Sequence, residues 1–371
     1  MVVLLSRVRF PYAGFFIFKE KGFFVKMLFY HARFGGNMKL SKEEIKMITT
    51  GYINVAETEK GLEFLRFSES QKVTFKNHHK GFDGDPFFDN YFADTCHTSA
   101  GMKFDFYTDA KKVSVGVSEN KAPYGQNLMV FDVLINGKPT ESFREVGDFT
   151  FKACGKRQKR VRVTVFFPNY DGPVISEVEI DGTYVEPAGT EPEILTVGDS
   201  ITQGAGSDSF ATWVNVMSQT LGMTVLNQAS TGYVYDARTV ERLCNPKIVI
   251  CAYGINDHGR KTREELFTET DEYISATKKA YPDAMIAAVV PVWTVSEKNK
   301  KDRDFTEESR RILRKAYEKN NIYVIEGLKM VPHREEFFAD TVHPSAKGHR
   351  IYGLRMAKEI KKILNLKENE K

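Results

Sequence analysis

In the first half of the chain, apolar and polar residues alternate with a period of two. Such alternation predicts strands that bury one face and expose the other. The clearest examples are the segments Phe104 to Phe106, Val113 to Val117 and Val161 to Val165. Many short strands of this kind are typical of an antiparallel sandwich or jelly roll. We therefore expect an all-β domain over residues 38–186.

Two dipeptides between these segments have the composition of a two-residue hairpin turn. Asn136-Gly137 follows the apolar run FDVLI, and Asp181-Gly182 lies between ISEVEI and TYVEP. Asn, Asp and Gly tolerate the positive φ angles that such turns require. Both sites therefore predict hairpins. The next segment, residues 187–193, is rich in Pro, Gly and Glu and is expected to be a linker.

From residue 194 onward, short apolar runs alternate with longer amphipathic segments. The runs are ILTV, TVLN, KIVICAYG, MIAAVVPV and IYVIE, and the segments between them include FATWVNVMSQTLG, TREELFTETDEYISATKKAY and TEESRRILRKAYEKN. Alternation of this kind indicates parallel strands joined by crossover helices. We therefore expect residues 194–371 to form a layered α/β domain around a parallel sheet.

Residues 1–37 continue neither pattern. They contain eight of the 28 Phe residues and six Lys or Arg residues against a single acid, Glu20. Their apolar run PYAGFFIF is far shorter than the roughly 20 residues that span a bilayer, and no small-residue cleavage site follows it. We expect residues 1–37 to be a leader or a non-native extension, with Met38 as the natural start.

The charge of the chain lies mainly in that extension. Without residues 1–37, 47 basic residues face 48 acidic ones, so the composition offers no nucleic-acid face. We expect neither a nucleic-acid nor a membrane partner. The four cysteines lack zinc-type spacing, so no metal is expected, and they favour a reducing compartment. We expect a cytoplasmic protein, with secretion as the alternative.

The segment ILTVGDSITQGAG places polar residues directly after the first predicted parallel strand. Gly198-Asp199-Ser200 would then lie at the carboxyl end of that strand, where open α/β sheets bind ligands. The glycine spacing fits neither a phosphate loop nor a dinucleotide fingerprint. Two interpretations remain, a structural turn and a serine held for nucleophilic attack.

Other predicted strands end in residues of complementary chemistry. Gly232 follows the second run, Asn256 follows the third, and Asp340 and His343 precede the last helix. Because parallel strands end at the same edge of a sheet, we expect these residues to meet Ser200 there. A serine hydroxyl needs a neighbouring base to attack an ester. His343 is the candidate base, and Asp340 would orient it.

The oxyanion of such a reaction also needs hydrogen-bond donors. The backbone N–H groups of Ser200 and Gly232 and the side-chain amide of Asn256 are the candidates. No cofactor is required by this chemistry. The alternative for Asn256 and for His343 is a structural role, in which each residue caps a helix.

The four blocks Gly198-Asp199-Ser200, Gly232, Gly254-x-Asn256-Asp257 and Asp340-x-x-His343-Pro344 resemble those of the SGNH, or GDSL, hydrolase superfamily. The resemblance covers roughly residues 190–365 and implies a three-layer, flavodoxin-like fold. It departs at Gln228-Ala229, where a glycine often stands. A β domain followed by an SGNH domain also resembles the family-two carbohydrate esterases, which remove acetyl groups from polysaccharides.

This resemblance implies a serine esterase that removes short acyl groups, such as acetyl, from an oligo- or polysaccharide. Asp199, Tyr233 and Trp293 are the expected substrate-binding residues, with Tyr235 beside them. Trp293 could equally serve in packing between domains. The alternatives are a lipase or lysophospholipase and a non-catalytic carbohydrate-binding protein. The many charges in the strand-end loops favour short acyl groups over long ones.

Several other polar residues receive ordinary interpretations. His349 is expected on the surface of the last helix, and Asp257 and His258 on a solvated loop. The acidic stretch at residues 83–94 lacks the glycine and the terminal Glu of a calcium loop and is expected to be a polar loop.

Overall fold

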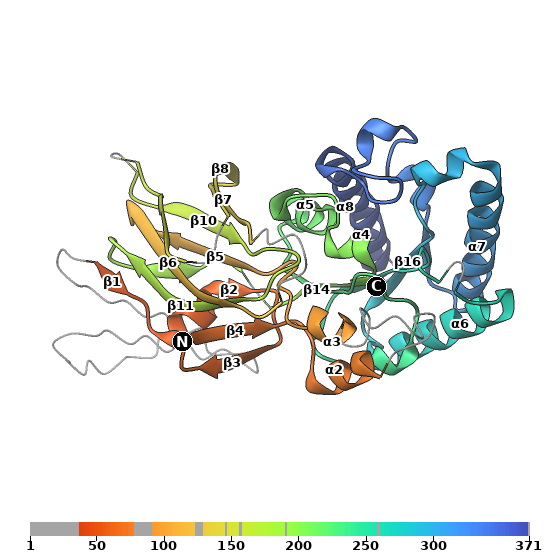
Figure 1. Ribbon diagram of the computed structural model, residues 1–371, viewed down its shortest axis with the longest axis horizontal. Helices are drawn as coiled ribbons and strands as arrows, with labels where there is room; N and C mark the ends of the chain where they lie inside the picture. The colour runs from red at the N-terminus through yellow and green to blue at the C-terminus, as the bar shows by residue number, and fades with distance from the viewer. Residues whose placement is uncertain are drawn as a thin grey trace.

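The computed structural model describes residues 37–77, 91–122, 129–144, 147–155, 158–189, 191–257 and 260–369. In Figure 1 a sandwich of two antiparallel sheets lies beside an α/β part with a parallel sheet. The expected fold class is thereby confirmed. The segment 1–37, apart from Asn37, lies outside the described residues, as does most of the stretch 83–94.

Each antiparallel sheet has six strands. The first has the order β3 (Asn54–Thr58), β4 (Gly61–Leu65), β11 (Pro173–Ile180), β6 (Lys112–Asn120), β9 (Phe149–Lys152), with β1 (Met38–Lys39) also paired to β11. The second has the order β12 (Val185–Pro187), β5 (Lys103–Thr108), β10 (Val161–Phe166), β7 (Phe131–Ile135), β8 (Lys138–Phe143), with β2 (Thr49–Thr50) also paired to β5. Helix α1 (Lys42–Ile48) links β1 to β2.

The period-two pattern produces the core of this sandwich. Val161, Val163 and Val165 on β10 are fully buried and pack between the sheets, whereas Arg162 on the same strand turns away and pairs with Asp105 on β5. Side chains of successive strand residues point to opposite faces. One face of each sheet therefore supplies the apolar core.

Of the two expected hairpins, one is present and one is wrong. Asn136 and Gly137 have φ angles of 50° and 76° and join β7 to β8. Asp181-Gly182 instead carries the chain from β11 in one sheet to β12 in the other. Asp181 Oδ1 accepts the backbone N–H groups of residues 111 and 112, both at 2.7 Å, which fixes this crossing.

A helical segment between β4 and β5 leaves the sandwich. Helices α2 (Glu69–Lys76) and α3 (Tyr91–Thr95) lie against the α/β part in Figure 1. Phe75 and Phe92 pack edge-on against Tyr233, with ring centroids 4.5 and 5.1 Å away. Residues from the first half of the chain thus enter the core of the second half, which the period-two pattern did not predict.

The α/β part has a parallel sheet in the order 2-1-3-4-5 that is typical of flavodoxin-like folds. Its strands are β13 (Ile194–Gly198), β14 (Val225–Ala229), β15 (Ile248–Ala252), β16 (Met285–Val289) and β17 (Tyr323–Ile325). Its helices are α4 (Ser200–Gln203), α5 (Trp213–Leu221), α6 (Arg263–Ala280), α7 (Lys300–Lys319) and α8 (Ala346–Asn369). Apolar residues of α5 and α8 cover one face of the sheet, and those of α6 and α7 cover the other.

The register of the parallel sheet aligns the strand ends. Gly198, the last residue of β13, is paired with Ala229 on β14 and with Ala252 on β15. The loops that follow these three strands therefore begin at one edge of the sheet. None of the helices within the described ranges is both long and apolar enough to cross a bilayer.

Candidate active site

Ser200 is the first residue of α4, directly after β13. Asp199 caps this helix, because its Oδ1 accepts the backbone N–H of Ile201 at 3.0 Å. The Asp199 side chain is only 2% exposed, and burial raises its pKa to about 7. A contact between Asp199 and a substrate stays a prediction. Asp199 holds the turn that presents Ser200.

His343 meets Ser200 from the loop before α8. The Ser200 Oγ and His343 Nε2 atoms are 2.8 Å apart, and His343 Nδ1 lies 2.7 Å from Asp340 Oδ2. Partial burial raises the pKa of Asp340, but hydrogen bonds from the backbone and ring of His343 and the N–H of Val342 outweigh burial and lower it overall. An ionised Asp340 keeps the proton on Nδ1, which leaves Nε2 free to accept the proton of Ser200.

The candidate oxyanion donors lie on the three strand-end loops. Among the described residues, none accepts a hydrogen bond from the backbone N–H of Ser200 or of Gly232. Gly232 has a φ of 76°, which favours glycine at this bend. Asn256 Nδ2 donates one hydrogen bond to Tyr233 O at 3.2 Å, which orients the amide and leaves its second N–H for a ligand.

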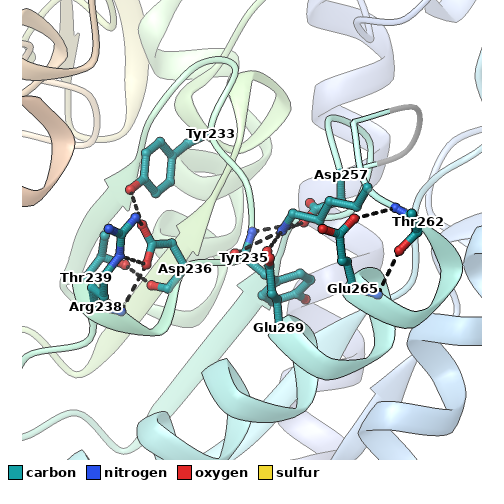
Figure 2. Close-up of polar contacts among 10 residues, drawn as sticks. Tyr233, Tyr235, Asp236, Arg238, Thr239, Asp257, Thr262, Glu265 and Glu269 are labelled. Atoms are coloured by element: carbon teal, nitrogen blue, oxygen red, sulfur yellow. Dashed lines mark hydrogen bonds and ion pairs between the residues drawn. The ribbon is translucent and has the colours of Figure 1, made fainter. Parts of the chain in front are cut away.

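The loops that carry Gly232 and Asn256 are bonded to each other. Asp257 Oδ1 accepts the N–H of Tyr235 at 3.1 Å, and Lys261 Nζ donates to the same carboxylate at 2.6 Å and to Tyr235 O at 3.0 Å. Glu269 on α6 binds Lys261 from the other side at 2.6 Å. Figure 2 shows Tyr235, Asp257 and Glu269 converging. These contacts fix the two loops relative to each other.

The expectation that Asp257 lies on a solvated loop is wrong, because its side chain is fully buried in this network. His258 lies outside the described residues.

The expectation that Tyr233, with Tyr235 beside it, contacts a substrate is wrong. Tyr233 and Tyr235 are buried, because their hydroxyls bind Asp236 and Tyr317 and their rings pack in the core. Figure 2 shows the Tyr233 hydroxyl beside Asp236.

Trp293 is half-buried at the other side of the site. It stacks on His333, with ring centroids 5.2 Å apart, and its ring also contacts Phe338 edge-on. Phe338 in turn forms a bridge with Pro344, next to His343. Trp293 therefore supports the loop of His343. Its contact with a substrate stays a prediction.

Two residues that contact the site were missed by the sequence analysis. Tyr170, in the loop between β10 and β11, places its hydroxyl 3.4 Å from Ser200 O and 3.1 Å from Thr231 Oγ1. Gln203 on α4 accepts the Thr231 N–H at 2.7 Å. Tyr170 comes from the sandwich, and no periodicity or motif in the sequence links it to Ser200.

A cleft of about 680 Å³ opens between the sandwich and the α/β part, beside His343. Its walls in the sandwich are Val130, Arg144 and residues 168–171, and its walls in the α/β part are residues 204–209, 339, 340, 343 and 346. Several of these side chains are polar or charged, Arg144 and Asp208 among them, with their charged groups 4.0 Å apart. A molecule bound in the cleft next to His343 therefore meets polar groups.

His349 is another correction, because it is fully buried rather than exposed. Its Nδ1 accepts the N–H of Trp213 at 3.2 Å, so the proton lies on Nε2, which donates to Ala205 O at 2.9 Å. Burial lowers the pKa of His349 to about 4. A neutral His349 thus ties α8 to α5 and to the loop after α4.

This burial predicts a pH effect on stability. The unfolded chain binds a proton at His349 near its ordinary pKa of 6.5, whereas the folded protein resists protonation until about 4. The free energy of unfolding is therefore expected to fall as pH drops from about 6.5 to 4, by up to about 3 kcal/mol. Denaturant titrations over this range should show a smaller fall in His349→Gln. Equal falls in both proteins would contradict the assignment.

Asn256→Ala is expected to lower kcat by about 10² to 10³-fold with little change in KM, because it removes one oxyanion donor. Ester hydrolysis kinetics measure both constants. Asn245→Ala, on the surface of the same part of the protein, is the control and should leave kcat unchanged. A fully active Asn256→Ala would remove Asn256 from the oxyanion hole.

Comparison with known proteins identifies this half of the chain. The model of the GDSL-like lipase/acylhydrolase family matches residues 196–351, which include Ser200, Gly232, Asn256, Asp340 and His343. No curated protein sequence matches the chain.

Solved structures share the arrangement of both halves. The salicylyl-acyltransferase SsfX3 of a tetracycline biosynthetic pathway is 16% identical with a TM-score of 0.69, and the match covers 85% of this chain and 94% of that one. A family-two carbohydrate esterase from Cellvibrio japonicus is 13% identical with a TM-score of 0.59, covering 90% and 99%. One from Myceliophthora fergusii, with a carbohydrate-binding domain, is 17% identical with a TM-score of 0.59, covering 72% and 95%.

At such identities these neighbours establish the fold, and the family model adds the class of enzyme. Residues 196–351 match the GDSL-like lipase/acylhydrolase family, and the protein is a carboxylic ester hydrolase.

Proposed function

We propose that the protein removes short acyl groups, foremost acetyl, from carbohydrate through an acyl-enzyme on Ser200. The observation that carries the proposal is the continuous chain of contacts from Ser200 Oγ to His343 Nε2 at 2.8 Å and from His343 Nδ1 to Asp340 at 2.7 Å. This is the geometry that a hydroxyl needs to become a nucleophile at neutral pH.

In the acylation step, His343 Nε2 takes the proton of Ser200 while Oγ bonds to the ester carbonyl carbon. The carbonyl oxygen becomes an anion and receives hydrogen bonds from the N–H groups of Ser200 and Gly232 and from Asn256. The bond from that carbon to the sugar oxygen then breaks, and His343 returns the proton to the departing alcohol.

Water completes the cycle by the same route. His343 takes a proton from the water as its oxygen bonds to the acyl carbon, and the second tetrahedral anion occupies the same donors. The bond to Ser200 Oγ then breaks, Oγ regains its proton from His343, and the free acid leaves. The base action is worth roughly 10² to 10⁴-fold in rate.

The size and position of the cleft support a carbohydrate as the departing alcohol. Since His343 protonates that alcohol, the alcohol must lie on the side of the site where the cleft opens. Its volume of about 680 Å³ can hold a sugar residue, and the charged side chains of Arg144 and Asp208 on its walls can bind hydroxyl groups. Two neighbours of the same fold are family-two carbohydrate esterases, which agrees with this substrate class.

The alternatives fit the site less well. A lipase or lysophospholipase would need an extended apolar groove, whereas this cleft is bordered by Arg144, Asp171 and Asp208. A non-catalytic carbohydrate-binding protein would have no need of the Ser200, His343 and Asp340 geometry. We also propose a cytoplasmic location, which suits the four cysteines, all free thiols.

The test is a substrate panel. Acetate release from acetylated xylo-, manno- and gluco-oligosaccharides is expected for at least one sugar class. Among p-nitrophenyl esters, we expect kcat/KM for the two-carbon acyl group to exceed that for eight carbons by about tenfold or more. A preference for eight carbons would favour the lipase alternative, and ester hydrolysis without acetate release from any sugar would remove carbohydrate from the proposal.

A further inference from the structure

Arg66, directly after β4, is a buried cation that hydrogen-bonds to no carboxylate within the part of the chain that the structure describes. Its side chain is fully buried, and burial lowers its pKa to about 9, so the guanidinium remains charged at neutral pH. Its bonds to the described residues go to neutral oxygens. Nε donates to Thr98 O at 2.7 Å and Nη2 to Thr98 Oγ1 at 2.5 Å. Burying a charge without an opposite charge beside it costs free energy. We therefore expect the buried charge of Arg66 to serve a function.

The third guanidinium nitrogen of Arg66, Nη1, reaches into the α/β part. Nη1 binds the carbonyl oxygens of Asn227 and Ala229, the latter at 3.1 Å. Both carbonyls belong to the carboxyl end of β14, and Ala229 stands three residues before Gly232. Arg66 therefore fixes the point at which the chain leaves the sheet toward the oxyanion loop.

A second route connects Arg66 to the helix of the nucleophile. Thr98 Oγ1, which accepts from Arg66, also accepts from Gln203 Nε2 at 3.3 Å. Gln203 is the last residue of α4, the helix that Ser200 begins, and its Oε1 accepts the N–H of Thr231 at 2.7 Å. The Gly232 loop and the Ser200 helix are thus held in one network.

Tyr170 closes this network from the other side. Its hydroxyl lies 3.1 Å from Thr231 Oγ1 and 3.4 Å from Ser200 O. Arg66, Thr98 and Tyr170 all belong to the first half of the chain, whereas Ser200, Gly232 and the residues between them belong to the second. The first half therefore contacts the two segments that carry the backbone donors of the oxyanion hole, through a few buried bonds.

We propose that Arg66 is a positioning residue for the oxyanion hole and that the hydrolase domain is incomplete without the sandwich half. The bonds to Ala229 and Thr98 set the direction of the Gly232 and Ser200 N–H groups before substrate binds. The fixed positive charge of Arg66 also favours the negative charge that develops there, because a buried cation acts through a low dielectric. This inference rests on the proposed esterase mechanism and adds to it the residue that prepares its anion site.

Arg66→Lys tests the proposal. Lysine keeps the charge, but its single ammonium cannot span Thr98 and the β14 carbonyls as a planar guanidinium does. For p-nitrophenyl acetate we expect kcat to fall by about 10 to 100-fold with KM within about twofold, since only transition-state contacts are lost.

A boronic acid inhibitor supplies a second readout. Its boron takes the Ser200 oxygen to form a tetrahedral anion with one oxygen in the oxyanion hole, so its affinity should fall by the same factor as kcat. Unchanged kcat and boronate affinity in a folded Arg66→Lys would overturn the proposal. So would equal losses in the affinity for substrate and for the boronate.

Two further variants control for stability. Val163→Ala, in the sandwich core, removes apolar contacts that are not part of the network and should lower the melting temperature without lowering kcat. If Arg66→Lys does not fold, Thr98→Val removes only the hydroxyl that joins Arg66 to Gln203, and we expect a kcat loss of about 3 to 10-fold. A fully active Thr98→Val would then overturn the proposal.

Failure of this inference is distinguishable from failure of the proposed function. A wild-type protein with no activity on any ester would end the esterase mechanism itself. An active wild-type protein with an equally active Arg66→Lys would end only the role of Arg66.

Discussion

Ser200→Ala is expected to reduce acetate release by at least about 10⁴-fold while leaving the fold and carbohydrate binding intact. The Oγ atom is the proposed nucleophile, and it lies 2.8 Å from His343 Nε2. Removal of a nucleophile from such a triad costs about as much as removal of the whole triad. Steady-state kinetics and calorimetric titration with the sugar product measure the two effects separately.

The matched control is Ser118→Ala on β6, an exposed serine of the sandwich. It should match the wild type in both measurements. Substantial acetate release by a carefully purified Ser200→Ala would show that Ser200 is not the nucleophile. Loss of sugar binding together with activity would show that the change disturbs the cleft instead.

His343→Ala is the second large effect, with an expected fall in kcat of about 10⁴-fold. Without His343 the Ser200 hydroxyl has no acceptor for its proton. A Ser200→Ala/His343→Ala double variant should be no slower than either single variant, because the two residues act as one unit. Parallel kinetics of the three proteins measure this.

His333→Ala is the control, since His333 is exposed and stacks on Trp293 without contacting Ser200. It should retain most of the wild-type kcat. If instead the losses of Ser200→Ala and His343→Ala multiply in the double variant, the two residues act in separate steps and the triad mechanism is wrong.

Sequence patterns predicted the fold and the edge at which the site forms, because both depend on periodicity and strand order. Ser200, Gly232 and Asn256 each follow a buried parallel strand, and the register of such strands brings their ends together. His343 was found because a base and its orienting carboxylate stand three residues apart before a helix. Periodicity, strand order and the spacing of Asp340 and His343 are local features of the chain, so a single sequence is enough to identify them.

The wrong predictions for Tyr233 and His349 have a common physical origin. Whether Tyr233 faces a cleft or the core depends on Phe75 and Phe92, which are more than a hundred residues away. The burial of His349 likewise depends on Trp213 and Ala205. Contacts at such separations follow from packing, which no local pattern records.

The residues missed altogether show the same limit. Arg66 and Tyr170 lie in the strand-rich half and contact the oxyanion loops only in the folded protein. In the sequence they resemble ordinary residues at the ends of strands. A buried arginine that is bonded to backbone carbonyls becomes visible only when its hydrogen bonds are known.

The most direct test of the central claim is covalent labelling with a p-nitrophenyl phosphonate ester, followed by peptide mapping. Such a reagent reacts with a serine that has both a base and an oxyanion site, and it forms a stable adduct. We predict one adduct per chain, on Ser200, with labelling greatly slowed in His343→Ala. A protein that hydrolyses esters but carries the label on another residue, or none at all, would contradict the account.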